Sequence, residues 1–311
     1  MQSVLGEVKA EALGKTLVHE HIVAGMSGVF LDWRFAVDRQ QIVDRACEVL
    51  KRARQHGLQT FIDATTMEMG RNPELLAEVS SRTGTTIVCS TGLYASQHGL
   101  PTHFRQMTVN EVADLYTEEL MTGIAGTGIR SGVIKVATSS DEPTDSEVKV
   151  LQAAAIAQQR AGVPIITHTT GGGGDRQAAI LIEQGVPAAS LVIGHVDHKN
   201  SSLRYLARIL RSGASIAFDR VGSEQFLPES IRAGLFAGLI SEGYADQLFL
   251  SMDSSISWIG PVHPAAQAPP EPCIYLFVKF LPILRRMGVS DEVLEHVLVD
   301  NPRRLFLAAQ R

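Results

Sequence analysis

The sequence lacks the features that would point to a nucleic acid, a membrane or a secretory route. Its 28 Lys and Arg residues are outnumbered by 33 Asp and Glu residues, so the chain offers no basic surplus for nucleic acid. No apolar run is long enough to span a bilayer, and the N-terminal residues do not combine a basic segment with an apolar core. We therefore expect a cytoplasmic protein that binds neither nucleic acid nor membrane.

Cysteine is also scarce. Cys47, Cys89 and Cys273 are odd in number and scattered, and no two of them form a CxxC pair. A disulfide framework is therefore not indicated, and we expect reduced, mostly buried thiols.

Apolar stretches of β-strand character alternate with amphipathic helical patterns along the chain. The expected strands lie at 15–22, 60–66, 86–94, 132–138, 164–170, 191–197, 215–220 and 248–255. The expected helices lie at 38–56, 73–83, 109–123, 146–161, 175–184, 201–212, 228–243, 274–287, 291–299 and 303–309. Strands that read as near-continuous apolar runs are typical of parallel sheets covered on both faces. Eight strand–helix units over this length predict a (β/α)8 TIM barrel with extra C-terminal helices.

An open doubly wound sheet is the alternative fold. Such a sheet usually carries a glycine-rich dinucleotide loop after its first strand, whereas the first strand here ends in HEHIVAG. No linker or shift in composition divides the chain, so we expect residues 1–311 to form a single domain.

The first expected strand ends on His19 and His21, with one residue between them. Side chains two apart on a β-strand point to the same face, so both imidazoles would converge on one point. On a helix they would point to different sides. From this stretch alone, two partly buried structural histidines are as good an explanation as two metal ligands.

Further polar residues lie at the ends of later strands, and in a barrel the strand ends at the C-terminal face carry the chemistry. These residues are Lys135, His168, His195 and Asp253. Each has a structural explanation by itself, but imidazoles and a carboxylate at one rim suit zinc, cobalt, iron or manganese. Six ligands exceed the needs of one tetrahedral ion and predict a pair of divalent cations.

Lys135 lies inside the apolar run GVIKVAT. Burial of an unpaired ammonium is costly and lowers the pKa of a lysine. A neutral amine beside two cations can react with carbon dioxide, and the resulting carbamate would bridge the two metals. The alternative is a lysine whose stem packs while its ammonium reaches solvent, but the four histidines and the aspartate at the same rim favour the bridge.

The stretches LVHEHI, GVIKVAT, ITHTT, VIGHVD and SMDSS, with VDNPRRLF near the C-terminus, resemble the phosphotriesterase family of the amidohydrolase superfamily over nearly the whole chain. The resemblance implies a barrel with a binuclear centre, in which we expect zinc. It would place His19, His21 and Asp253 on the more buried ion, and His168 and His195 on the more exposed one. The lysine, carboxylated on its side-chain nitrogen, and a hydroxide would bridge the two ions.

Two features resemble the phosphotriesterase-like lactonases within this family. The sequence TGLY places Tyr94 at the end of the third strand, where those lactonases keep a tyrosine near the centre. The sequence FDR places Arg220 after the seventh strand, where phosphotriesterases proper resemble FDH. The missing histidine belongs to a proton relay from the metal-bound aspartate, so its replacement disfavours efficient hydrolysis of phosphotriesters.

The stretch after His195 departs from the family pattern. Relatives usually have an aspartate three positions on, whereas this chain has Asp197 two positions on and His198 three positions on. The usual Asp–Arg pairing behind the site is therefore not carried over to this chain. The chain's remaining histidines lie mostly in expected loops or helices, and we expect most of them, His198 included, to be solvated.

A Pro-rich loop follows the last strand, and long loops in compact domains are often functional. We expect Trp258 in this loop to line a pocket for the leaving group or acyl chain, with a rigid surface loop as the alternative. The run Gly171–Gly174 is not followed by the lysine of a phosphate-binding loop. It predicts a turn from strand to helix, and a metal-free phosphate-binding barrel is the weaker reading.

Together the residues and the resemblance imply a hydrolase that opens lactones, with weak activity on organophosphate triesters. Asp253 would accept a proton from the nucleophile, Tyr94 would hydrogen-bond the lactone ring oxygen, and Arg220 would brace the end of the seventh strand. A phosphotriesterase or carboxylesterase on the same site is the first alternative, and a metal-free binding protein on a degenerate barrel is the second. The resemblance also implies a homodimer acting on a small molecule.

Overall fold

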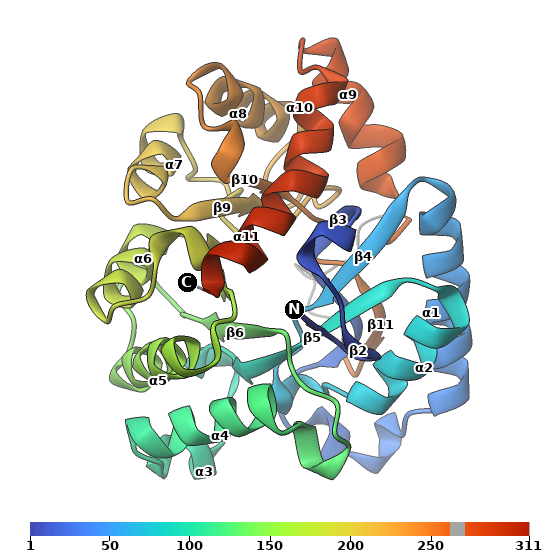
Figure 1. Cartoon of the computed structure of the whole chain (residues 1–311), viewed down its shortest axis with the longest axis vertical. Coiled ribbons are helices and arrows are strands. Elements are labelled where there is room, and N and C mark those ends of the chain that lie inside the picture. The colour runs from blue at the N-terminus through green and yellow to red at the C-terminus, as the bar shows by residue number, and fades with distance from the viewer. Residues whose placement is uncertain (262–270, 311) are drawn as a thin grey trace.

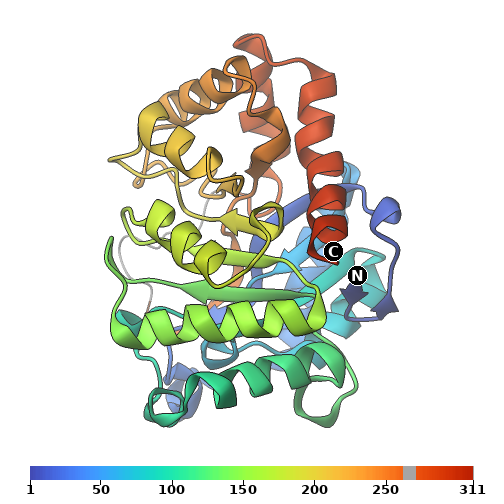
Figure 2. The same ribbon diagram turned by 60° about the vertical axis from the view of Figure 1, so that its left-hand side comes forward.

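The computed structural model of the chain describes residues 1–261 and 271–310. Parallel strands form a barrel with helices around it (Figures 1 and 2). The strands are β3 (Lys15–Gly25), β4 (Leu58–Asp63), β5 (Thr86–Leu93), β6 (Val133–Ala137), β7 (Ile165–His168), β8 (Leu191–Ile193), β9 (Ser215–Phe218), β10 (Leu248–Leu250) and β11 (Ser255–Ile259). The strands from β3 to β10 pair in this order along the chain, and β11 pairs with β3. The predicted TIM barrel is therefore confirmed.

The helices follow the strands as predicted. They are α1 (Arg39–Gln55), α2 (Pro73–Thr83), α3 (Thr102–Gln106), α4 (Val109–Met121), α5 (Asp145–Ala161), α6 (Gly174–Glu183), α7 (Leu203–Leu210), α8 (Glu229–Ser241), α9 (Leu281–Arg286), α10 (Asp291–Glu295) and α11 (Asn301–Ala309). Two π-helical segments, Leu276–Phe280 and His296–Asp300, lead into α9 and α11. The short helix α3 and a small hairpin of β1 (Gln2–Ser3) and β2 (Gly6–Glu7) were not predicted.

Local sequence determines where several helices begin. Asn72 caps α2 with its side chain, and a proline follows it in the first turn. Thr108 and Thr144 begin α4 and α5 with capping boxes, in which Glu111 and Glu147 bond back to the cap residues. In the part of the chain that the structure describes, no helix combines the length and apolar character needed to cross a membrane.

The predicted eighth strand is divided into two short strands that close the barrel. β10 pairs with β9 and β11 pairs with β3, both in parallel. Between them Asp253 has a φ of +51°, a left-handed conformation that interrupts an extended strand. The predicted loop therefore begins later than expected, because Trp258 lies on β11. The part of that loop at 262–270 lies outside the described residues.

One end of the barrel interior is filled with apolar side chains. Each strand from β3 to β10 contributes one of them: Val18, Ile62, Val88, Val133, Ile166, Val192, Ala217 and Phe249. Leu305 and Phe306 of α11 and Leu13 before β3 pack against this layer. The opposite end, toward which the strands run, is left for polar groups.

Candidate metal centre

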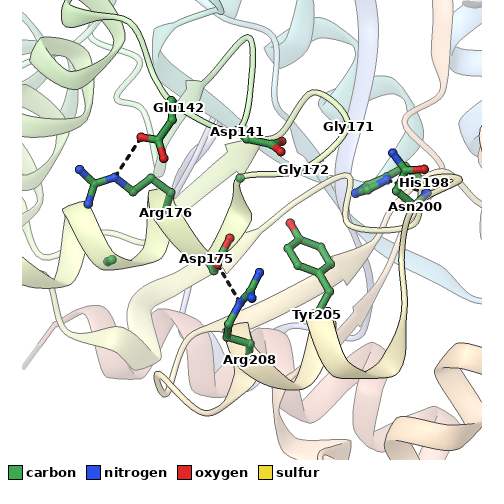
Figure 3. Close-up of a pocket in the computed structure, with 12 residues that line it drawn as sticks. Asp141, Glu142, Gly171, Gly172, Asp175, Arg176, His198, Asn200, Tyr205 and Arg208 are labelled. Carbon is green, nitrogen blue, oxygen red and sulfur yellow. Dashed lines mark hydrogen bonds and ion pairs between the residues drawn. The ribbon is translucent and has the colours of Figure 1, made fainter.

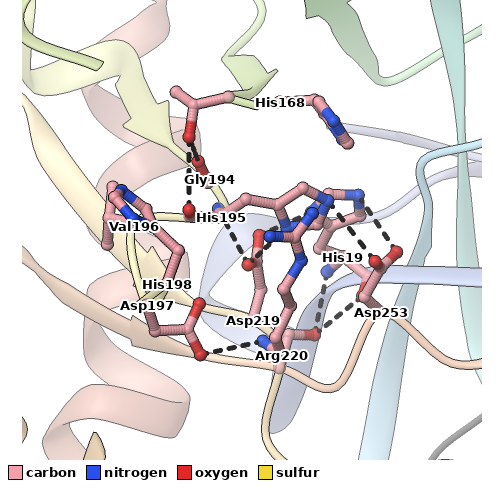
Figure 4. A network of polar contacts seen from close by, with 12 residues as sticks. His19, His168, Gly194, His195, Val196, Asp197, His198, Asp219, Arg220 and Asp253 are labelled. Carbon is pink, nitrogen blue, oxygen red and sulfur yellow. Dashed lines mark hydrogen bonds and ion pairs between the residues drawn. The ribbon is translucent and has the colours of Figure 1, made fainter. Parts of the chain in front are cut away.

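The six predicted ligands gather at the C-terminal end of the strands, inside the barrel. They come from β3, β6, β7, the residues after β8 and the break between β10 and β11: His19, His21, Lys135, His168, His195 and Asp253. Figure 4 shows His19, His168, His195 and Asp253 turned toward one another. Segments that are far apart in the sequence therefore bring their polar side chains to one point.

The contacts among these side chains are close. The ring of His19 stacks on the ring of His195 with 4.7 Å between centroids, and the His168 ring meets the His195 ring edge-on at 4.2 Å. Nζ of Lys135 lies 2.6 Å from Nε2 of His19. One carboxylate oxygen of Asp253 lies 3.2 Å from Nε2 of His21, and the other lies 3.4 Å from Nε2 of His195.

Strand alternation explains most of this convergence. Lys135 is two residues after Val133, and His168 is two residues after Ile166, so each faces inward above the apolar layer. His19 and His21 share a face as predicted, with ring centroids 5.5 Å apart. The register between β3 and β4 shifts between Leu17 and Glu20, which re-aims the side chains of β3.

Two of the predicted ligands depend on unusual backbone conformations. His195 has a φ of +56° and Asp253 a φ of +51°, both uncommon for residues with a Cβ atom. In each case the left-handed turn follows a short strand, β8 or β10, and lets the side chain enter the barrel mouth. Such strained residues concentrate at functional sites, where the surrounding structure holds them in place.

The sequence analysis missed the residue that orients two of the imidazoles. Asp219 is fully buried after β9 and accepts hydrogen bonds from Nδ1 of both His19 (2.6 Å) and His195 (2.7 Å), as Figure 4 shows. A third imidazole, His21, contacts Oγ1 of Thr65 through Nδ1 at 2.9 Å. The Nε2 atoms are thereby turned to the centre, the arrangement that metal-binding histidines require. A carboxylate directly after a strand was the signal that could have revealed Asp219.

A second missed residue, Glu20, fixes the segment that carries Asp253. Its buried carboxylate accepts hydrogen bonds from Oγ of Ser251 at 2.8 Å, and from the N–H groups of Met252 and Ser254 at 2.7 Å each. These three bonds bracket Asp253 on both sides. Glu20 lies between the two histidines of HEHI and points to the neighbouring strand.

The electrostatics of the centre favour neutral imidazoles and an ionised aspartate. Burial, and then the nearby positive charges, lower the pKa of His168 and His195 well below the ordinary value. Burial also lowers the pKa of Lys135 to about 8, well below that of a free lysine. Burial opposes ionisation of Asp253, but the fields of His195 and the other histidines outweigh it and lower its pKa.

These observations fit a divalent cation. Ligand atoms of His19, His195 and Asp253 lie within 4.8 Å of one another, which is the spacing that one ion can gather. The imidazoles are uncharged, and a carboxylate supplies the negative charge, as metals of the zinc class require.

The three residues predicted to contact substrate differ in how closely they approach this group. The hydroxyl of Tyr94 lies 3.1 Å from Nδ1 of His168, and the Tyr94 N–H donates to the buried carboxylate of Glu68. Arg220 follows Asp219 and extends toward His195 (Figure 4). Trp258 is half-buried on β11 and pairs in register with Ala24, beyond the level of the ligands.

The structure corrects the expectation that His198 is solvated, because this residue is 6% exposed. Its Nδ1 accepts a hydrogen bond from the N–H of Asn200 at 3.2 Å. Asp197 is fully buried and pairs with Nε of Arg232 at 2.6 Å. The carboxylate of Asp197 is therefore engaged by Arg232. Arg220 contributes only its backbone N–H, which donates to this carboxylate at 3.2 Å.

A polar cavity of about 500 Å³ opens beside the centre, between α6 and α7 (Figure 3). Its two arginines are already paired, Arg176 with Glu142 and Arg208 with Asp175. The N–H of Gly174 donates to the hydroxyl of Tyr205, so the first turn of α6 is partly satisfied. The glycine run is thus the strand-to-helix turn that the sequence predicted, and it lines this cavity.

We compared the chain with known protein families, sequences and structures. The family model described as the phosphotriesterase family matches residues 1–306. An aryldialkylphosphatase from Saccharolobus solfataricus is 32% identical over 305 residues, covering 96% of each chain. The organophosphorus hydrolase of Deinococcus radiodurans superposes with a TM-score of 0.92 at 39% identity, covering 98% of this chain and 96% of that one.

A mutant of the PTE-like lactonase from the same organism superposes with a TM-score of 0.91 at 38% identity. The match covers 98% of this chain and 99% of that chain, so the two chains share their fold over nearly their whole length. With a full-length family match and a shared barrel, this chain belongs to the phosphotriesterase family.

Proposed function

We propose that this chain hydrolyses lactones at a binuclear metal centre and acts only weakly on organophosphate triesters. Membership of the family makes it a metal-dependent hydrolase that acts on ester bonds. The observation that carries the proposal is the convergence of Lys135 with four histidines and Asp253 at one end of the barrel. Tyr94 beside His168, and Arg220 in the place of a relay histidine, favour a lactone over a phosphotriester.

The centre would hold two divalent cations, zinc most of all, with cobalt, iron and manganese as alternatives. His19, His21 and Asp253 would hold one ion, and His168 and His195 the other. Lys135, buried and with its pKa lowered to about 8 by burial, would be carboxylated by carbon dioxide and bridge them. When bound, such a pair lowers the pKa of water and polarises the carbonyl oxygen of the substrate.

The residues of this chain would then divide the remaining work. Asp253, which stays ionised, takes a proton from the attacking water and delivers it to the leaving alkoxide. Tyr94 keeps its proton, because burial raises the pKa of its hydroxyl, and donates a hydrogen bond to the ring oxygen of the lactone. Trp258, beyond the ligands on β11, contacts the acyl chain.

A substrate panel tests this assignment. Zinc-loaded enzyme is assayed on γ- and δ-lactones of increasing chain length, on paraoxon and on a p-nitrophenyl carboxylic ester. We expect the best lactone to exceed paraoxon in kcat/KM by at least about 100-fold, since no relay histidine follows Asp219. A higher kcat/KM for paraoxon would instead favour the phosphotriesterase, and activity on the carboxylic ester alone would favour the carboxylesterase.

We also propose that the chain forms a homodimer. The segment between β3 and α1 exposes large apolar side chains, namely Phe30 (40% exposed), Leu31 (91%), Trp33 (84%) and Val37 (37%). A cluster of this kind is costly in water and is typical of a surface that another protein covers. A second copy of the chain is the partner that the family suggests.

Light scattering on size-exclusion chromatography tests the dimer. The double change Leu31→Glu and Trp33→Glu is expected to convert the dimer to a monomer, because two carboxylates would be buried without partners. Met121→Glu changes an exposed apolar residue (56%) outside this segment and should leave the dimer intact. A wild-type monomer, or a dimer that survives the double change, would contradict the proposal.

A further inference from the structure

The guanidinium of Arg220 is buried beside the candidate centre and forms no ion pair within the part of the chain that the structure describes. Its side chain is 8% exposed, and its guanidinium lies over the ring of Phe226 with 4.0 Å to the centroid. Nε is buried without a hydrogen-bond partner. Among residues 1–261 and 271–310, the guanidinium has no carboxylate in ion-pairing contact, and no hydrogen bond from it is found.

The neighbouring residues explain why Arg220 is left unpaired. The carboxylate of Asp219 is engaged by His19 and His195. Asp197 is engaged at 2.6 Å by Arg232, which also pairs with Glu229. The next residue, His198, carries no negative charge. Its Nδ1 accepts the N–H of Asn200, so the neutral ring carries its proton on Nε2 and cannot accept from a guanidinium there.

An unpaired guanidinium in a buried position costs free energy, which a ligand of opposite charge can recover. The guanidinium is planar and presents its N–H groups in a fork that matches the two oxygens of a carboxylate or phosphate. It also lies close to the centre, because Figure 4 shows the side chain of Arg220 extending from the residue after Asp219 toward His195. A bound oxyanion would therefore sit within one small molecule's length of the reacting bond.

We propose that Arg220 binds a carboxylate or phosphate group carried by the substrate, so that this enzyme prefers anionic lactones to neutral lactones of the same size. The inference rests on the proposed lactone hydrolysis and names the substrate class of that site. The paired arginines of the cavity in Figure 3 make a natural contrast, because Arg176 and Arg208 already face carboxylates.

Matched substrates test the proposal. One γ-lactone carries a pendant carboxylate, a second carries the methyl ester of that group, and a third carries a phosphate on a side chain of equal length. For the wild-type enzyme we expect kcat/KM for either anion to exceed that for the neutral ester by about 10- to 100-fold, mainly through KM. A larger effect for the carboxylate than for the phosphate, or the reverse, identifies the natural oxyanion.

Two variants remove the preference by different routes. Arg220→Met deletes the cation, and His198→Asp keeps it but supplies a carboxylate beside it; in both, the ratio of kcat/KM for anionic over neutral lactone should fall toward one. Arg208→Met removes a paired arginine from the neighbouring cavity and should keep the wild-type ratio. Equal kcat/KM values for charged and neutral lactones in the wild type would overturn the inference. So would an unchanged ratio of these values in Arg220→Met.

An equilibrium measurement separates this inference from the proposed activity. If no lactone is opened, the hydrolytic proposal fails, but anion binding can still be measured. For this purpose glutarate is titrated calorimetrically into zinc-loaded wild type and into Arg220→Met. We expect the variant to bind glutarate at least about tenfold more weakly, since a charge-assisted pair is lost. Equal affinity in the two proteins would show that Arg220 does not recognise the anion.

Discussion

Replacing Asp253 by Asn is expected to lower kcat for lactone hydrolysis by about 1,000-fold, within the range that a positioned general base contributes. The carboxylate lies 3.2 Å from His21 and 3.4 Å from His195, and the surrounding histidines keep it ionised. An amide of the same shape can still fill the space but cannot take a proton from the attacking water. Steady-state kinetics on the best lactone measure the loss.

Metal analysis of the same samples separates the two roles of this residue. If Asp253→Asn retains the metal and loses turnover, the proton role accounts for the effect, whereas loss of metal assigns the effect to ligation. Asp175→Asn is the matched control, because that carboxylate pairs with Arg208 in the neighbouring cavity and should keep wild-type turnover. Near-normal turnover in Asp253→Asn would contradict the mechanism proposed here.

Replacing Lys135 by Ala should reduce activity by at least about 100-fold and weaken metal binding, because the bridging group is lost. The side chain is 1% exposed and its Nζ lies 2.6 Å from His19, so its removal leaves a small space at the centre. Short carboxylic acids such as acetate or propionate fit that space and should restore part of the activity. Activity against acid concentration, with metal content alongside, measures the rescue.

Lys135→Met provides the control for this rescue. Methionine fills the space with an apolar side chain of similar length, so added acid should restore nothing. Full metal occupancy in Lys135→Ala, with no response to any short acid, would contradict a bridging role for this residue. Mass spectrometry of the native protein under carbon dioxide gives an independent view of the carboxylated side chain.

Periodicity and strand composition predicted the barrel, since each strand–helix unit has its own apolar pattern and turn. They did not predict the division of the last strand. That division depends on Asp253 in a left-handed conformation and on bonds from Glu20 to residues more than 230 positions away. A pattern within one strand carries no information about such contacts, so Trp258 was assigned to a loop although it lies on β11.

The convergence of the candidate ligands could be predicted because barrel topology brings all strand ends to one face, whatever their separation in the sequence. The supporting residues could not be placed in this way. Asp219 was passed over beside Arg220, although the same strand end carries both. The engagement of Asp197 by Arg232 joins the segment after β8 to α8. The burial of His198, whose ring lies beside Tyr205 of α7, likewise depends on side-chain packing between segments.

The central claim is that one end of this barrel holds two metal ions on six named side chains. Anomalous diffraction at the zinc edge, from crystals grown with zinc, tests it most directly. We predict two peaks about 3.5–4 Å apart, contacted by His19, His21, Lys135, His168, His195 and Asp253, with added density on Nζ of Lys135. A single peak, or peaks that these side chains do not contact, would contradict the account.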